Sequence, residues 1–104
     1  VAFSDLERLD LRVGLIRSAV EVPGAKRLLQ LTVDLGGEPR KCVAGIKGSY
    51  AAGELIGRSV VVVANLEPRT IRGLRSECML LAAEEGDLSL VVPDRPVKAG
   101  TPVG

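Results

Sequence analysis

The 104-residue sequence contains no histidine and no tryptophan, and its only aromatic residues are Phe3 and Tyr50. Histidine is the side chain most often used for proton transfer near neutral pH, so its absence disfavours catalysis. A glycine-rich phosphate loop, a GxSxG elbow and a paired-carboxylate spacing are absent as well. The sequence therefore favours a binding function, and an enzymatic one is a minor alternative.

Cysteine is also scarce, since Cys42 and Cys78 are the only two. They do not form a CxxC pair, and no histidine can join them around a metal. The sequence therefore predicts no metal site and no cofactor. Both lie inside apolar runs, which favours buried free thiols over a disulfide and fits a reducing, cytoplasmic compartment.

Long hydrophobic runs are missing, because no apolar stretch approaches the ~20 residues that a membrane span needs. The N-terminus lacks a charged start followed by an apolar run, so we expect a soluble protein that is neither exported nor membrane-bound. Val1 in place of methionine fits either a processed start or a piece of a longer chain.

The charges nearly balance, with 14 Lys and Arg against 13 Asp and Glu and a formal net charge of +1. Any electrostatic contact surface must therefore be local. Basic residues gather in the middle of the chain, whereas Glu84, Glu85 and Asp87 form an acidic turn after them.

The length predicts a single domain spanning residues 1–104. Ser4 and Glu7 have the spacing of a capping box, which predicts a short N-terminal helix. Period-two alternation predicts strands from residue 11 and over 29–35, with a bulge or bend at Gly14. Gly36 and Gly37 predict a hairpin between the second strand and a third at 40–44. The remaining expected elements are a short helix at 51–56, strands at 58–66, 78–83 and 88–92, and an irregular tail.

Three meandering strands, a short helix and two further strands are the order of an all-β, five-stranded OB-fold barrel, here with short helices and a C-terminal extension. Strand number alone would also permit an SH3-like barrel, but the helix placement favours the OB-fold. Because 46% of the residues are hydrophobic, we expect a second copy to cover part of the surface. The expected homodimer contacts are the N-terminal helix at 1–9 and the extension at 88–104.

The segment from Val63 to Ala83 joins two apolar runs through a stretch that carries Pro68, Gly73 and three arginines. It reads as two buried strands bridged by a cationic loop. Arg69, Arg72 and Arg75 on one exposed loop indicate an anion-binding edge, because the guanidinium fork suits phosphate. An ordinary solvated loop is the alternative.

Five stretches together resemble the tRNA-binding domain family, which is appended to methionyl-tRNA synthetases and to the endothelial monocyte-activating polypeptide, and also exists as free-standing dimers. They are LDLRVGLI, LTVDLGG, VAGIK, GELIGRSVVVVANLEPRTIRGLRSECMLLAA and LVVPDRPVKAGT. The resemblance implies a cytoplasmic OB-fold module that dimerises, binds tRNA by shape without reading an anticodon, and can accompany a synthetase catalytic domain. Some relatives are linked with protein export, so a chaperone-like dimer is the alternative function.

The resemblance also implies the site residues. Positions of the family motif correspond to Asn65, Arg69, Arg72, Ser76 and Met79, with Lys47 in a neighbouring basic loop. Arg75 adds charge without a motif match, and further tRNA-binding candidates are Lys26, Arg27, Arg40 and Lys41. Cys78 stands where glycine is frequent in the family, and Lys26 where an acidic residue is frequent.

Each candidate residue also has an ordinary structural interpretation. Asn65 and Ser76 could bond their own turn, Met79 is more often a core residue, and Arg40 and Lys41 could lie on an exposed strand edge. With Phe3 and Tyr50 as the only aromatic residues, base stacking cannot be the main mode of RNA binding. Contacts to phosphates and 2'-hydroxyls of a folded RNA need only cations and polar groups on a rigid face.

Overall fold

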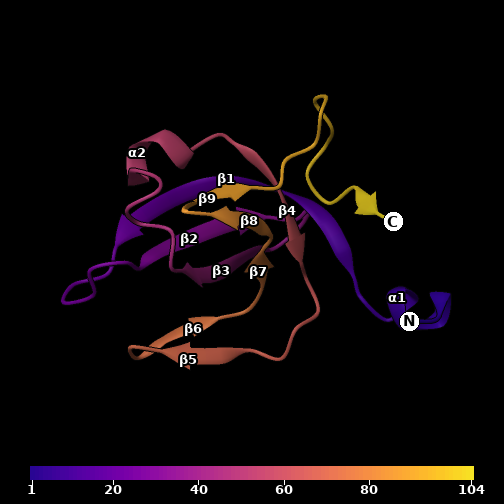
Figure 1. The fold of residues 1–104 in the computed structure, drawn as a ribbon, viewed down its shortest axis with the longest axis horizontal. Coiled ribbons are helices and arrows are strands. Elements are labelled where there is room, and N and C mark those ends of the chain that lie inside the picture. The colour runs from indigo at the N-terminus through magenta and orange to yellow at the C-terminus, as the bar shows by residue number, and fades with distance from the viewer.

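The computed structural model describes residues 1–104 and consists mostly of antiparallel strands (Figure 1). The helices are α1 (Phe3–Glu7) and α2 (Ala52–Leu55). The strands are β1 (Leu11–Glu21), β2 (Leu29–Asp34), β3 (Pro39–Ala44), β4 (Ser59–Val63), β5 (Arg69–Ile71), β6 (Leu74–Ser76), β7 (Met79–Leu80), β8 (Ala82–Glu85), β9 (Asp87–Leu90) and β10 (Pro102–Val103). No helix has the length and apolar character needed to cross a membrane.

The long strand β1 organises the sheet, whose order is β3-β2-β1-β4-β7, with β10 paired to the beginning of β1. β4 pairs with the first half of β1, from Leu11 to Leu15, and β2 pairs with the second half, from Leu15 to Glu21. One strand thus has different neighbours along its length, as in a small barrel that curls around its core. The predicted all-β, OB-like barrel is confirmed, and α2 follows β3 as expected.

The core lies inside this curled sheet. Its fully buried members include Ile16 from β1, Leu29 and Leu31 from β2, Leu55 from α2 and Val60 from β4. The four valines of β4 are all buried, which confirms the prediction of a central strand covered on both faces. Both cysteines are buried free thiols, as the sequence predicted.

The barrel closes along a seam between β3 and residues 76–78, and we use the word seam for this junction. Glu77 donates its backbone N–H to the carbonyl of Lys41 at 2.8 Å, and Val43 donates its N–H to the Ser76 hydroxyl at 3.0 Å. The Glu77 carboxylate accepts the N–H of Lys41 at 3.2 Å. Side chains therefore replace part of the backbone ladder that would otherwise close the barrel.

Gly14 does not mark the bulge that the sequence predicted. The register shift of β1 falls between Ile16 and Ser18, whereas Gly14 pairs regularly with Val60. A Cβ atom at Gly14 would lie 2.5 Å from Cγ1 of Val33. The glycine is thus needed because side chains from both strands that flank β1 converge over this position.

The N-terminal helix begins earlier than the capping-box spacing predicted. Ala2, and not Ser4, is the N-cap residue, and the Asp5 carboxylate accepts the backbone N–H of Ala2 at 3.0 Å. Asp5 thus satisfies the backbone N–H of the N-cap residue. The sequence had predicted the same bond between Glu7 and Ser4. No residue of α1 is buried.

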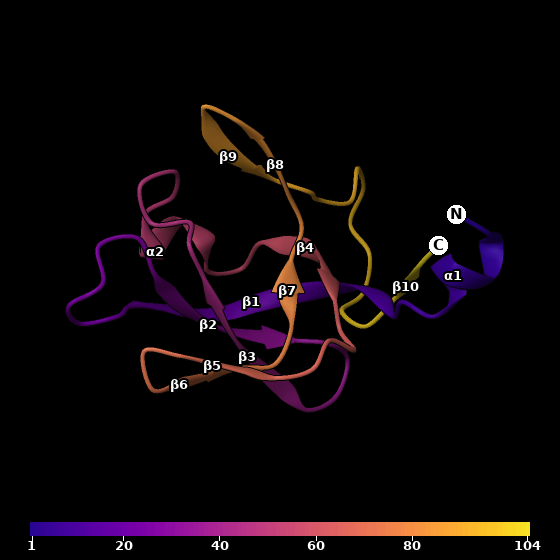
Figure 2. The same cartoon turned by 60° about the horizontal axis from the view of Figure 1, so that its bottom comes forward.

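The prediction of a cationic loop is wrong, because residues 69–76 form two paired strands, the β5–β6 hairpin (Figure 1). The predicted strand at 78–83 is also divided. Only β7 continues the main sheet, and β8 pairs instead with β9 in a second hairpin that projects from the barrel (Figure 2). The two hairpins lie on opposite sides of β7 in this view.

Candidate nucleic-acid interface

The β5–β6 hairpin carries the three arginines that the sequence singled out. Arg69 is opposite Ser76, and Thr70 is opposite Arg75. Because side chains alternate between the faces of a strand, Arg69 and Arg75 lie on opposite faces of the hairpin. Arg72 stands at the tip. The three guanidinium groups therefore surround the hairpin and do not form one flat patch.

The tip of this hairpin is a two-residue turn with an unusual occupant. Arg72 has a φ of 53° and the following Gly73 a φ of 78°. Two positive φ angles in succession fit a type I′ turn, where asparagine followed by glycine is preferred. Arg72 is the only residue other than glycine with a positive φ. Its backbone conformation costs about 1 to 2 kcal/mol relative to the right-handed one.

The arginines of the hairpin are exposed and weakly paired. Arg69 and Arg72 take part in no salt bridge, and Arg75 lies 3.7 Å from the Glu77 carboxylate with 67% of its side chain exposed. An exposed pair of this kind contributes little to stability. These charges are consequently available to an anion in solution.

Beside the hairpin lies a groove of about 860 Å³ between β3, the β5–β6 hairpin and the β8–β9 hairpin. Its lining is mostly hydrophobic, with Arg69 on one wall and Glu84 on another. We call it the seam groove, and its other lining residues are Cys42, Val43, Ala44, Gly45, Ile46, Leu66, Glu67, Pro68, Ser76, Cys78, Met79, Leu80, Ala82, Leu88 and Leu90.

Ser76 and Met79 both line the seam groove but differ in exposure. Ser76 is buried, and its hydroxyl accepts the N–H of Val43 and donates to the carbonyl of Cys78 at 3.5 Å. Met79 is 51% exposed, so the core position that its residue type favoured is wrong. Met79 is the more accessible of the two motif residues.

Asn65 does not line the seam groove and lies at the junction between β4 and the N-terminal segment. Its Oδ1 accepts the N–H of Asp10 at 2.9 Å, and its Nδ2 donates to the carbonyl of Arg8 at 2.8 Å. The side-chain amide thus holds the end of α1 against the barrel. The alternative interpretation, a hydrogen bond from Asn65 to its own turn, is wrong, because its two partners are 55 and 57 residues away in the sequence.

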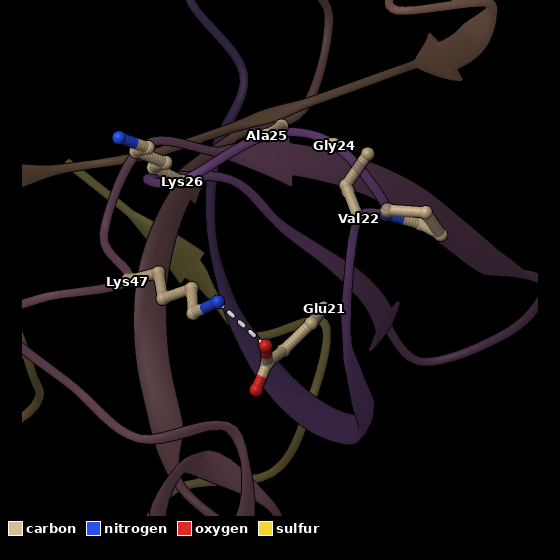
Figure 3. A pocket seen from close by; sticks show the side chains of 7 residues that line it. Glu21, Val22, Gly24, Ala25, Lys26 and Lys47 are labelled. Carbon is tan, nitrogen blue, oxygen red and sulfur yellow. Dashed lines mark hydrogen bonds and ion pairs between the residues drawn. The ribbon is translucent and has the colours of Figure 1, made fainter.

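Lys47 and Lys26 lie at a separate pocket of about 380 Å³ formed by the β1–β2 turn (Figure 3). The Lys47 ammonium forms an ion pair with Glu21, and Lys26 points away from this pair. Arg27 is exposed, and its carbonyl accepts the N–H of Lys47 at 3.1 Å. These three cations form a second basic region, with one of its charges already neutralised.

Arg40 and Lys41 of β3 are engaged within the protein. Nη1 of Arg40 donates to the carbonyl of Ala64 at 3.2 Å, and the Lys41 ammonium donates to the Thr32 hydroxyl at 2.8 Å. Arg40 therefore ties β3 to the end of β4, and only Lys41 has the exposed position that the strand-edge interpretation predicted.

The sequence missed the lining residues supplied by the β8–β9 hairpin, among them Glu84, Leu88 and Leu90. The alternation of Leu88 and Leu90 was visible, but only as a strand signal. No group of three or more His, Cys, Asp or Glu side chains comes together in a way that could hold a metal ion.

The chain is similar to known proteins over nearly its whole length. Residues 11–102 match the family described as "Putative tRNA binding domain". The chain is 48% identical, over 99% of its length, to a methionine–tRNA ligase of Methanocaldococcus jannaschii, and 50% identical to that of Pyrococcus abyssi over the same share. It spans only 16% and 14% of these two relatives.

Solved structures give the same fold over the whole chain. A MetRS-related protein from Pyrococcus horikoshii superposes with a TM-score of 0.94 at 30% identity, covering 97% of that protein. The chaperone CsaA from Bacillus anthracis superposes with a TM-score of 0.90 at 32% identity, covering 98% of that chain. Both comparisons cover 100% of the present chain.

Proposed function

Because this chain belongs to the tRNA-binding domain family, we propose that it binds folded tRNA by shape and charge, without reading the anticodon sequence. It does so either as a free-standing protein or as the C-terminal appendage of a methionyl-tRNA synthetase. The relatives that it matches are synthetases several times its length, which supports the second arrangement. The chain itself supplies binding, and any catalytic step belongs to such a partner domain.

The observation that carries this proposal is the position of Arg72. A long cationic side chain stands at the tip of a hairpin, free of any salt bridge, in a backbone conformation that asparagine or glycine would adopt at lower cost. A residue that is unfavourable for the turn is best explained by what its side chain does outside the protein. Phosphate is the natural partner of a free guanidinium fork.

The aromatic residues support a mode that does not depend on stacking. The Tyr50 hydroxyl accepts the N–H of Leu90 at 3.1 Å, and the Arg58 guanidinium covers its ring at 5.4 Å. Phe3 belongs to α1, which lies at the far end of the molecule from the tip of the cationic hairpin (Figures 1 and 2). The hairpin therefore has cations but no ring beside it. Cations suffice for contacts to phosphates and riboses, which need no stacking.

We propose the following division among the candidates. Arg69, Arg72 and Arg75 contact phosphates, Met79 supports the RNA at the edge of the seam groove, and Ser76 positions the hairpin by holding the seam. Asn65 acts on the RNA through the N-terminal segment that it fixes. Lys47, Lys26, Arg27 and Lys41 extend the basic surface, and Arg40 mainly braces β3.

The test is a filter-binding titration of Arg72→Asn with folded tRNA over a range of salt concentrations. We expect affinity to fall severalfold, and the slope of log affinity against log salt to decrease by about 0.7 to 0.9 for one lost phosphate contact. Stability should change in the opposite direction, rising by roughly 0.5 to 1 kcal/mol, because asparagine suits the turn.

The matched control is Arg95→Gln, which removes one charge from a side chain that is 88% exposed in the C-terminal tail. It should leave both the affinity and the salt slope nearly unchanged. Equal binding of folded tRNA and an unstructured RNA by the wild-type protein would contradict the proposal.

A second candidate function is the binding of polypeptide segments, in the manner of a chaperone. The specific observation is the seam groove, which combines an apolar floor with a cationic and an acidic wall and has exposed Leu66 and Met79 on its lining. Similarity to the chaperone CsaA also favours it. Leu66→Ser, which removes the apolar side chain without adding charge, should abolish suppression of aggregation of a denatured test protein and should leave tRNA affinity unchanged.

A further inference from the structure

Cys42 and Cys78 lie on opposite sides of the seam that closes the barrel. Their exposed fractions are 1% and 5%, and both belong to the same buried cluster. Cys42 is flanked by Lys41 and Val43, each of which is hydrogen-bonded across the seam to Glu77 or Ser76. These bonds hold the backbone on both sides of Cys42 against residues 76 and 77, directly before Cys78.

The two thiols also interact with each other. The neighbouring Cys78 thiol lowers the pKa of Cys42 below its usual range, aided by the backbone N–H of Leu80. The pKa of Cys78 is raised, first by the neighbouring Cys42 sulfur and then by burial. Cys42 is thus the better nucleophile, and Cys78 keeps its proton.

Burial does not isolate this pair from small molecules. Both cysteines line the seam groove, whose other lining residues include Leu66 and Met79, with 41% and 51% of their surfaces exposed. Both cysteines therefore border a groove that has room for a reagent of a few atoms but not for a folded protein.

We propose that Cys42 and Cys78 are a reversible oxidation site that forms a disulfide when a small hydroperoxide enters the seam groove. The Cys42 thiolate attacks the peroxide, the O–O bond breaks, and a sulfenic acid forms as water or an alcohol leaves with the available proton. The Cys78 sulfur then attacks Cys42, the S–O bond breaks, and the departing hydroxide leaves as water with the Cys78 proton. Two thiols lose two electrons, and the peroxide gains them.

The disulfide would replace a weak closure by a covalent one. The seam relies on a few hydrogen bonds, two of which involve the side chains of Ser76 and Glu77. A bond between Cys42 and Cys78 would close a chain segment that contains α2, β4 and the cationic hairpin, and would anchor the base of that hairpin. Free thiols remain the resting state in a reducing compartment, because cytosolic disulfides are usually transient.

The test is treatment of the native protein with hydrogen peroxide, followed by alkylation and mass spectrometry. We expect an intact mass lower by two hydrogens, apart from any methionine oxidation, and a tryptic species joining residues 42–47 to residues 76–98. The apparent Tm should rise by about 5 °C or more, and dithiothreitol should reverse both changes.

The chain provides its own control for reagent access, because Met79 is its only methionine and lines the same groove. If Met79 becomes the sulfoxide while both cysteines remain alkylatable, the proposal is overturned. Formation of the disulfide only after unfolding in denaturant would overturn it as well.

Two single variants separate the roles of the sulfurs. Cys78→Ser should arrest at an oxidised Cys42 that a sulfenic-acid probe traps, whereas Cys42→Ser should react with peroxide at least tenfold more slowly. Equal rates for the two variants would contradict the assigned order of attack. These measurements involve no RNA and are independent of the proposed function.

Discussion

Gly14 shows how one residue allows the side chains of two neighbouring strands to pack over the strand between them. Any Cβ there would lie 2.5 Å from Val33 and 3.1 Å from Leu35, both of which are buried and cannot withdraw. The contact forces β1 and β2 to shift or their side chains to leave favoured rotamers. A small residue is thus required by the side chains of the adjacent strands, although the φ of Gly14 is unremarkable.

We predict that Gly14→Ala destabilises the protein by roughly 1 to 3 kcal/mol, the usual cost of overpacking a core. Urea unfolding followed by circular dichroism will measure this change. Gly37→Ala is the matched control, since a Cβ at Gly37 meets nothing within 4 Å. Equal stability of the two variants would show that the barrel absorbs the extra methyl group.

Asp34 predicts a specific dependence of stability on pH. The Asp34 carboxylate accepts hydrogen bonds from the Arg17 guanidinium and from the N–H of Gly36, each at 2.8 Å. These bonds lower the pKa of Asp34. A depressed pKa in the folded state means that the stabilisation is present above the ordinary aspartate pKa of 3.8 and is lost as the pH falls through the lower folded value.

Asp34→Asn should therefore be less stable than the wild-type protein at pH 6, and the difference should shrink as the pH falls below about 4. Denaturant midpoints of both proteins, measured between about pH 2 and pH 6, will test this, because aspartate carboxylates titrate within that range. Glu38→Gln, in the same turn, is the control because Glu38 makes no side-chain hydrogen bond or salt bridge. A constant difference between wild type and Asp34→Asn at all pH values would contradict the assignment.

At the scale of elements, α1 depends on Asn65 for its position. The helix buries no residue of its own, and the Asn65 amide bonds the carbonyl of Arg8 and the N–H of Asp10. A five-residue helix is not stable by itself in water. The helix therefore stays in place through contacts at its C-terminal end and through whatever covers its apolar side.

We predict that Asn65→Ala increases the rate of tryptic cleavage after Arg8 roughly fivefold, the effect of losing about 1 kcal/mol of hydrogen bonding. Mass spectrometry of a digestion time course will measure it. Glu67→Ala changes a nearby exposed side chain and should leave the rate unaltered. If Asn65→Ala weakens tRNA binding without faster cleavage at Arg8, Asn65 acts on the RNA directly.

At the scale of the whole molecule, the apolar side of α1 has nothing to cover it in a single chain. Phe3 is 73% exposed, Leu6 is 43% exposed and Leu9 is 45% exposed. The C-terminal β10, with exposed Val103, pairs with β1 next to this helix (Figure 2). We propose that a second copy covers this surface around a two-fold axis, since isologous dimers are the commonest homo-oligomers.

Leu6→Glu should convert a dimer into a monomer, which light scattering coupled to size-exclusion chromatography will show. Ile56→Glu is the control, because Ile56 is 54% exposed at the end of α2 on a different part of the surface. A monomeric wild-type protein at micromolar concentration would contradict the proposed dimer.

The sequence alone determined the strands β1 to β4 of the barrel, the glycine hairpin after β2, the buried valines of β4 and the cationic character of residues 69–75. These features are local, since alternation, turn residues and charge are written within a few neighbouring positions. The family resemblance added tRNA as the expected ligand, because its motifs are contiguous stretches of sequence.

Only the tertiary structure decided what Asn65, Ser76, Cys42 and Cys78 do. Their partners lie on other elements, so no local pattern could reveal them, and the seam groove exists only because β3 meets residues 76–78 through side chains as well as backbone. The β5–β6 and β8–β9 hairpins were also decided by the tertiary structure, because they form where the chain leaves the main sheet. Closing a small barrel brings distant residues together, and this closure turned two separate cysteines into one reactive pair.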